Sequence, residues 1–362
     1  MTGRERFLCA LNNGRPDRMP CQVHSWMDYY LRTYLNNMTH LEAYEYFDMD
    51  PVLYVSPTYK FRQEDLDNWV VKRDLDKEKR TWTTEITTPK GKLYDSGEWN
   101  DFTMWNITEI IKTEEDFELW KEFYPVPVGI DFSPVEEARR QVGDRGIVRC
   151  HPYSPGQGSP WQSFCTMMGT EPAIMLGMDE PETLHYYLDT ILEKTLKATA
   201  LWEGVPGDMV ETGGGAGSDT VISPKFFREF CLPYDKKQNE AFHNVGIKVV
   251  YHLCGGLMHQ LENVVESGAD GLETMTPPSM GGNCDLREAS RRVGDKLFFM
   301  GGFDQNAGFE KGTPEKVREL VFECFEATKD HAGYICVPSD HFFFGDPANI
   351  RAFADACKEC IY

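Results

Sequence analysis

A histidine and a cysteine stand two positions apart at the end of an apolar run near position 250. His252-Leu253-Cys254 follows the run IKVVY and is followed by two glycines. A second short apolar run, residues 268–274, brings Glu273 close to its end. Zinc in proteins takes cysteine sulfur, histidine nitrogen and carboxylate oxygen, usually as four ligands in a tetrahedron. The pattern favours a metal site, and the alternative interpretation is a packed histidine beside an inert buried cysteine.

These runs belong to an alternation of strand-like and helix-like segments that starts near residue 145. The apolar runs lie at 146–150, 207–212, 247–252, 268–274, 296–302 and 333–338, with helical segments such as 181–204 and 223–246 between them. Such alternation predicts parallel strands joined by right-handed crossovers. Six units, with further strands from the N-terminal region, predict an α/β fold of the (β/α)8 TIM-barrel type. We expect one domain over 1–362, with most of the barrel in 145–362.

The first 110 residues are expected to form an extension of this barrel. Around residues 80–100, threonine, tryptophan and isoleucine alternate with polar residues on both sides of Pro89-Lys90-Gly91. Alternation interrupted by turn residues is typical of a β-hairpin. The extension is therefore predicted to contain a hairpin.

The carboxyl ends of the predicted strands carry further polar side chains. In barrels of this type the chemistry takes place at those ends, in the loops that follow the strands. By this rule one rim of the barrel gathers His151, Glu211, Asp219, His252, Cys254, Glu273, Asp340 and His341. We expect Asp219 and His341 to be catalytic, and Glu211 and His151 to bind substrate. Solvated or merely hydrogen-bonded side chains are the alternative for these four.

Charge and cysteine content exclude several classes of partner. The formal net charge of −21 argues against nucleic acid and anionic membrane as partners. No run of about 18 apolar residues suggests a membrane span. Eleven cysteines without a recognisable secretory leader are typical of reduced thiols. We therefore expect a cytoplasmic protein.

Several short segments together resemble the uroporphyrinogen decarboxylase superfamily. They are HLCG at 252–255, GADGLET at 268–274, GGFDQ at 301–305, RERF at 4–7, PDRMP at 16–20 and ISP at 222–224. The resemblance extends over essentially the whole chain. It implies a distorted (β/α)8 barrel.

Within that superfamily the chain looks unlike the decarboxylase itself. Residues 21–30, CQVHSWMDYY, lack the arginines with which that branch grips the carboxylates of a tetrapyrrole. The segment HLCG is similar instead to the zinc-dependent methyltransferase branch, which exchanges a methyl group with a corrinoid protein. This resemblance implies zinc on His252, Cys254 and Glu273, together with a small-molecule methyl donor or acceptor. The chain has no corrinoid-binding signature, so the corrinoid is expected on a partner protein.

The last predicted strand departs from the methyltransferase pattern. The related families end it in Pro-x-Cys, and that cysteine is a further zinc ligand, whereas Asp340 occupies the position here. We predict Asp340 as the replacement ligand, with His341 as the rival, and expect Cys336 to lie too deep to coordinate. Two other functions stay open. One is a metal-free decarboxylase of a smaller acid, and the other is a non-catalytic protein that binds a tetrapyrrole or corrinoid.

Overall fold

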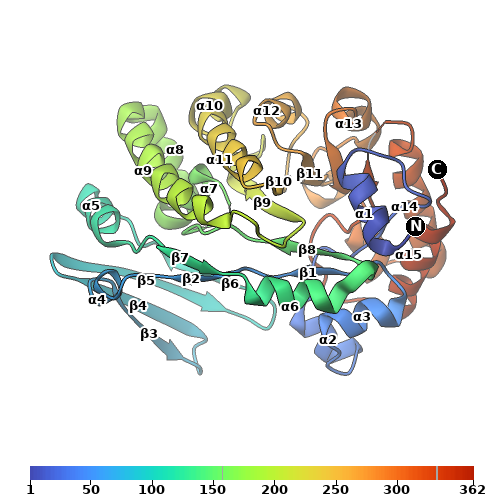
Figure 1. Ribbon diagram of the computed structural model, residues 1–362, viewed down its shortest axis with the longest axis horizontal. Helices are drawn as coiled ribbons and strands as arrows, with labels where there is room; N and C mark the ends of the chain where they lie inside the picture. The colour runs from blue at the N-terminus through green and yellow to red at the C-terminus, as the bar shows by residue number, and fades with distance from the viewer. Residues whose placement is uncertain (157, 332) are drawn as a thin grey trace.

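The computed structural model describes residues 1–362 except 157 and 332. In this described part, parallel strands form one sheet in the order β1-β8-β9-β10-β11-β12-β13 (Figure 1). Their bounds are β1 Val52–Tyr54, β8 Ile147–Cys150, β9 Met209–Gly213, β10 Lys248–His252, β11 Gly271–Thr274, β12 Phe298–Gly301 and β13 Tyr334–Ile335. Cys21 adds an eighth parallel position by pairing with Cys336, directly after β13. The predicted TIM-type barrel is confirmed, and each predicted barrel strand coincides with an observed one.

Helices connect the strands and cover the outside of the sheet (Figure 1). They are α6 Ser133–Val142, α7 Pro160–Met168, α8 Thr170–Asp179, α9 Pro181–Thr199, α10 Pro224–Phe230, α11 Leu232–Asn244, α12 Leu261–Glu266, α13 Leu286–Val293, α14 Pro314–Thr328 and α15 Pro347–Glu359. The segment 223–246, expected to be helical throughout, holds two helices. Pro233 lies in the first turn of α11, and proline is compatible with a helix start but not with a helix interior.

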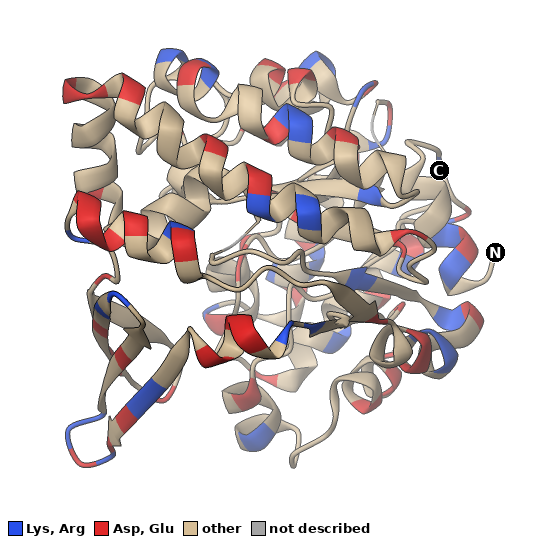
Figure 2. Cartoon of the chain, turned by 60° about the vertical axis from the view of Figure 1, so that its left-hand side comes forward, with Lys and Arg blue, Asp and Glu red and all other residues tan. Residues whose placement is uncertain are grey.

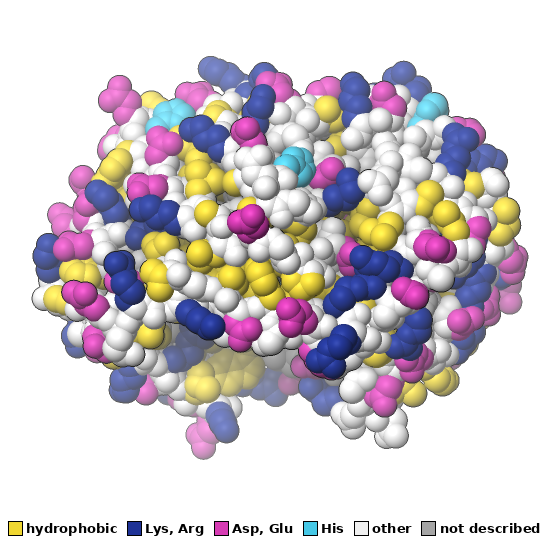
Figure 3. Space-filling model, in the orientation of Figure 1, with side chains coloured by type: hydrophobic (Ala, Val, Ile, Leu, Met, Phe, Trp, Pro, Cys, Tyr) yellow, Lys and Arg dark blue, Asp and Glu magenta, His cyan; other side chains and the backbone are white. Residues whose placement is uncertain are grey.

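The outer surface carries most of the charge. Acidic and basic residues lie along the outer helices (Figure 2), and charged side chains of both signs are interspersed on the face seen in Figure 3. None of the described helices combines the length and the apolar character needed to cross a membrane. The barrel interior holds one further group of charges, which is described below.

The N-terminal region contributes both to the barrel and to a separate antiparallel sheet. That sheet has the order β3-β4-β5-β6, with β3 Val70–Asp76, β4 Thr81–Thr88, β5 Gly91–Trp99 and β6 Met104–Thr108. The β4–β5 hairpin turns at Pro89-Lys90, as the sequence predicts, and pairs Ile86 with Leu93 on its buried face. Outside this sheet lie β2 Thr58–Lys60, β7 Gly129–Asp131 and the helices α2 Asp28–Tyr34, α3 His40–Phe47, α4 Gln63–Asp67 and α5 Glu114–Phe123.

Two apolar cores lie on the two faces of the barrel strands. Successive side chains of a strand point to opposite faces, so every second residue faces the lumen. The lumen core comprises Phe7, Ala10 and Leu11 of α1 (Gly3–Leu11) with Val52, Ile147, Met209, Val250, Phe298, Met300, Ile335 and Val337. The larger outer core packs strand residues such as Val148, Val210 and Phe299 against the helices. Helix α1 thus fills the amino-terminal end of the lumen with apolar side chains.

Candidate functional site

Arg149 lies at the centre of a charged cluster inside the barrel. It follows Ile147 by two residues on β8, so it faces the lumen, and its side chain is fully buried. Its Nη1 and Nη2 atoms each donate to one carboxylate oxygen of Glu273, both at 2.5 Å. Nη2 also donates to Glu211. One guanidinium therefore holds two buried carboxylates from strands β9 and β11.

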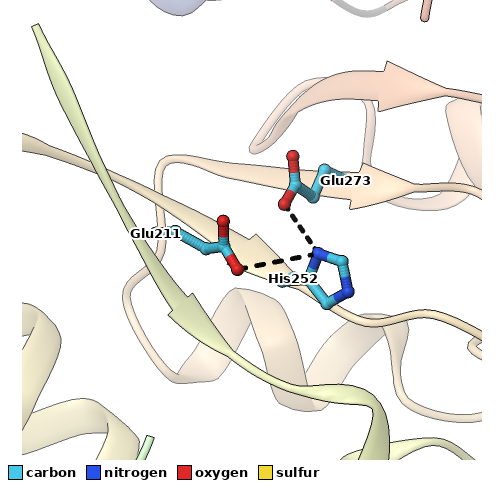
Figure 4. Close-up of side chains that lie close together, drawn as sticks. All are labelled: Glu211, His252 and Glu273. Carbon is cyan, nitrogen blue, oxygen red and sulfur yellow. Dashed lines mark hydrogen bonds and ion pairs between the residues drawn. The ribbon is translucent and has the colours of Figure 1, made fainter. Parts of the chain in front are cut away.

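His252 lies between the same two carboxylates (Figure 4). It ends β10, directly beside Glu273 in the register of β11. Its Nδ1 atom is 2.8 Å from Glu273 Oε1 and 3.9 Å from Glu211 Oε1. Ligand atoms of Glu211, His252 and Glu273 all lie within 4.8 Å of one another. Such a group of imidazole and carboxylate donors can hold a metal ion.

Cys254 stands beside His252 at the mouth of the barrel. Its thiol interacts with the His252 imidazole and its side chain is half-buried, but its sulfur is not among the ligand atoms that lie within 4.8 Å of one another. The chain turns sharply after it, because Gly255 has a φ of +91° and a Cβ there would lie 2.7 Å from the hydroxyl of Ser218. Thiol, imidazole and carboxylate together form a donor set that suits zinc.

Burial and ion pairing set the charges of the cluster. Burial disfavours ionised carboxyl groups, but Arg149 outweighs it and holds the pKa of Glu273 well below its usual value. The pKa of Glu211 is lowered for the same reason. Burial also opposes a charged imidazole, yet the contacts with Cys254 and Glu273 raise the pKa of His252 well above its usual value. The cluster is thus a network of balanced charges.

Two more imidazoles face this cluster. The ring of His24 lies 5.9 Å from that of His252 and 4.8 Å from that of His341. Burial, with positive neighbours, lowers the pKa of His24 to about 4, so this ring is neutral at physiological pH. Sequence reasoning missed His24, having used residues 21–30 only for their lack of arginine. The signal was present, since His24 is three residues beyond Cys21 at the end of the first barrel strand.

The structure separates the two candidates at the last strand. The Asp340 side chain is exposed, and its Oδ1 accepts a 2.7 Å hydrogen bond from the backbone N–H of His341. The His341 ring is turned toward His24, and its buried Nδ1 has no hydrogen-bond partner among the described residues. Cys336 faces the outer core, away from the lumen. The imidazole of His341, rather than the Asp340 carboxylate, therefore faces the cluster.

The remaining predicted residues lie on either side of the mouth. His151 is at the cluster, with its Nδ1 atom 3.7 Å from Glu211 Oε2 and its ring stacked on Tyr54. Asp219, in contrast, forms its hydrogen bonds with residues of two other loops. Its carboxylate accepts hydrogen bonds from the Asn283 amide at 2.8 and 3.0 Å and from the backbone N–H of His259 at 2.9 Å. Asp219 thus joins the loops that follow β9, β10 and β11.

Comparison with known proteins agrees with this architecture. The family model of uroporphyrinogen decarboxylase matches residues 106–360. The chain is 24% identical to a methylated-thiol–coenzyme M methyltransferase of Methanosarcina mazei over 58% of this chain and 53% of that protein, so the match spans about half of that relative. It is 26% identical to a uroporphyrinogen decarboxylase of Pseudomonas putida over 74% of this chain and 73% of the relative.

Solved structures give the same fold. A methyltransferase from Methanosarcina mazei superimposes with a TM-score of 0.66 at 14% identity, covering 99% of each chain. The fold, the matched family model and the motifs at 252–255 and 268–274 all point the same way, and the chain belongs to the uroporphyrinogen decarboxylase family.

Proposed function

We propose that this protein is a zinc-dependent methyltransferase that moves a methyl group between a small molecule and the cobalt of a corrinoid carried by a separate protein. The observation that carries the proposal is the group of metal-ligand side chains at the carboxyl ends of β9, β10 and β11. A relative whose name describes methyl transfer from methylated thiols supports the reaction class. The zinc ligands we propose are His252 and Glu273 of this group together with Cys254, which the sequence pattern supplies. Glu211, the third member of the group, lies beside them.

The fourth ligand position has two candidates. The sequence pattern favours Asp340, while the observed arrangement favours His341. The Asp340 carboxylate is engaged with the backbone of the next residue, whereas the buried Nδ1 of His341 is free to bind. An imidazole in this position would give the site two nitrogen ligands, one sulfur and one oxygen, a mixture that zinc accepts.

Zinc, when bound, supplies a Lewis acid that keeps a methyl-accepting sulfur or oxygen in its anionic form. The remaining tasks belong to the chain. The lumen core below the cluster excludes water from that side, since Val250, Met300 and Val337 are buried there. His24 flanks the mouth and orients the substrate. Positioning of this kind supplies a large share of catalysis in group transfer.

Three predicted residues keep roles in this proposal. His151 and Glu211 border the cluster on the β8 and β9 side, which supports their assignment to substrate binding. Asp219 remains a predicted catalytic residue. Its bonds to Asn283 and His259 support a second contribution, which is to hold three mouth loops in place.

A metal-free decarboxylase is the second candidate, because several relatives carry that name. Residues 21–30, at the first barrel strand, argue against uroporphyrinogen as the substrate of such a decarboxylase. They place His24 at the mouth and contain no arginine, while both terminal nitrogens of the nearby Arg149 are bonded to glutamates. Recognition of several substrate carboxylates needs cations free to bind them. Formation of coproporphyrinogen from uroporphyrinogen in an anaerobic assay would reverse this choice.

Metal analysis of protein purified without chelators is the first test. We expect about one zinc per chain, a stoichiometry typical of a single closed site. The second test follows methyl transfer between methylcobalamin and a simple thiol, since free cobalamin can stand in for the carried corrinoid. Zinc below about a tenth of an equivalent would end the metal proposal. Zinc without any methyl transfer would favour the non-catalytic binding protein.

A further inference from the structure

We propose that Arg149 is the positioning residue of the metal site, holding Glu211 and Glu273 in the geometry and charge that a divalent cation requires. The inference rests on the metal site of the proposed function. It concerns a residue that does not itself bind metal. Arg149 is on β8, on the strand next to β9 and away from the His-x-Cys motif, so no ligand pattern identifies it.

The contacts of Arg149 orient both glutamates. Arg149 binds Glu273 through two parallel N–H groups, from Nη1 and Nη2, both at 2.5 Å. The Nη2 atom also donates to Glu211. A planar fork fixes both the position and the plane of the carboxylate it binds. Held in this way, Oε1 of Glu273 and Oε1 of Glu211 both lie near Nδ1 of His252, at 2.8 and 3.9 Å. The arginine thus aims one oxygen of each glutamate at the same point.

The guanidinium of Arg149 is itself held in a fixed position. Arg149 lies above the lumen core, to which Ile147 of the same strand belongs, and the ring of Tyr54 covers its face at 4.9 Å. Its side chain is fully buried, so the ring and the two glutamates leave it a single orientation. Rigid support below the ligands is what preserves the geometry of a metal site.

Arg149 also contributes to the net charge of the buried cluster. Two glutamates and a Cys254 thiolate would place three negative charges around the ion, and Arg149 offsets one of them. A divalent cation then brings the buried cluster to neutrality, which is the least costly state for buried charges. A monovalent ion would leave the cluster negative. The arginine therefore adjusts the site to a divalent cation.

The test replaces Arg149 by lysine. Lysine keeps the charge but cannot form the planar fork. We expect Arg149→Lys to weaken zinc binding by about 10–100-fold, the usual effect of removing a residue that orients ligands. Affinity is measured by competition with a chromophoric chelator. The visible spectrum of the Co²⁺-substituted protein reports ligand geometry, and its d–d bands should change in shape and intensity.

A charge-matched double variant provides a second measurement. Arg149→Gln combined with Glu211→Gln removes one positive and one negative charge, so no unpaired charge is left buried, and this variant should fold even where Arg149→Lys does not. It should also bind zinc more weakly than Glu211→Gln alone, by about 10–100-fold. Wild-type affinity and an unchanged Co²⁺ spectrum in either folded variant would overturn the inference. So would lower thermal stability with unchanged metal affinity, which is the result expected of a purely structural ion pair.

The wild-type protein separates this inference from the proposed function. Absence of zinc from wild type would remove both. Zinc in wild type with equal affinity in Arg149→Lys would remove only the role of Arg149. Loss of methyl transfer is not used as a readout, since many changes near the site would reduce it.

Discussion

Two groups of buried ligand-type side chains lie on opposite faces of the barrel strands. The lumen cluster consists of Arg149, Glu211, His252 and Glu273. The second group, here called the thiol layer, consists of Cys21, Cys324, Cys336 and Cys357, between the strands and the helices α14 and α15. The lumen cluster is charged and adjoins Cys254 at the mouth. The thiol layer belongs to the apolar outer core.

The difference shows that residue type alone does not make a metal site. In the thiol layer burial raises the pKa of Cys357 well above the usual value for a thiol. At Cys336 burial is outweighed by hydrogen bonds with Cys324, Cys357 and Tyr334, which lower its pKa to about 5. Zinc binds the thiolate, so the neutral thiol of Cys357 is a poor ligand beside it. In the lumen, Arg149 keeps the neighbouring carboxylates ionised. The strand face on which a residue lies therefore decides whether its side chain packs in the core or can bind a metal ion.

The largest expected effect comes from removing one ligand of the lumen cluster. Cys254→Ser should reduce zinc from about one equivalent to less than about a tenth, because thiolate is the ligand zinc holds most firmly in this set. Metal content after dialysis against a weak chelator measures this.

The matched control is Cys336→Ser in the thiol layer, which should keep the full zinc content. Zinc loss in the control, or zinc retention in Cys254→Ser, would mean that the two groups have been assigned the wrong way round.

A smaller effect is expected at the fourth ligand position. His341→Ala should weaken zinc binding by about 10-fold or more, because a buried ring nitrogen with no other partner is removed. Asp340→Ala should leave the affinity within about threefold, since its carboxylate is exposed and accepts a hydrogen bond from the backbone N–H of His341. Isothermal titration with zinc distinguishes them. The reverse order of the two affinities would restore Asp340 as the ligand.

The sequence predicted the strands of the barrel well, because buried parallel strands are short apolar runs between helices. It predicted Glu211, His252 and Glu273 at one rim for the same reason. Three features depended on tertiary structure. The partner of the glutamates, Arg149, comes from a strand more than 60 residues earlier and looks like an ordinary arginine in an apolar run. His24 follows a strand reduced to one isolated bridge. The orientation of Asp340 depends on a local hydrogen bond from the backbone N–H of His341.

A buried carboxylate outside the barrel, that of Asp235, differs from the carboxylates of the lumen cluster. Asp235, on α11 outside the barrel, receives a 2.6 Å hydrogen bond from Tyr251, and no cation among the described residues contributes to its pKa. Burial therefore raises its pKa from 3.8 to about 7, the opposite of the shift in Glu273. The unfolded chain loses this proton near pH 3.8 and the folded chain near pH 7. Between these values the folded state binds more protons, so stability falls as pH rises.

This pH effect can be measured with Asp235→Asn, which keeps the shape and removes the charge. Wild-type stability should fall through this window by about 1.4 kcal/mol per pH unit from this group, and the variant should lack that slope. Urea unfolding between pH 4 and about 8 provides the data. Equal slopes in the two proteins would show that Asp235 ionises normally.

The smallest expected effect lies in the thiol layer itself. Cys357 lies on α15, is fully buried, and contacts the thiols of Cys21 and Cys336. Cys357→Ala removes one sulfur atom from a packed core, so we expect a loss of about 1 kcal/mol in the free energy of unfolding. Zinc content should stay at the wild-type value, because packing is the only role this layer has in our interpretation. Urea unfolding and metal analysis on the same preparation test both parts. A change in zinc content at this small cost in stability would mean that the outer face of the strands also influences the metal site, and the separation between the two groups would then have to be abandoned.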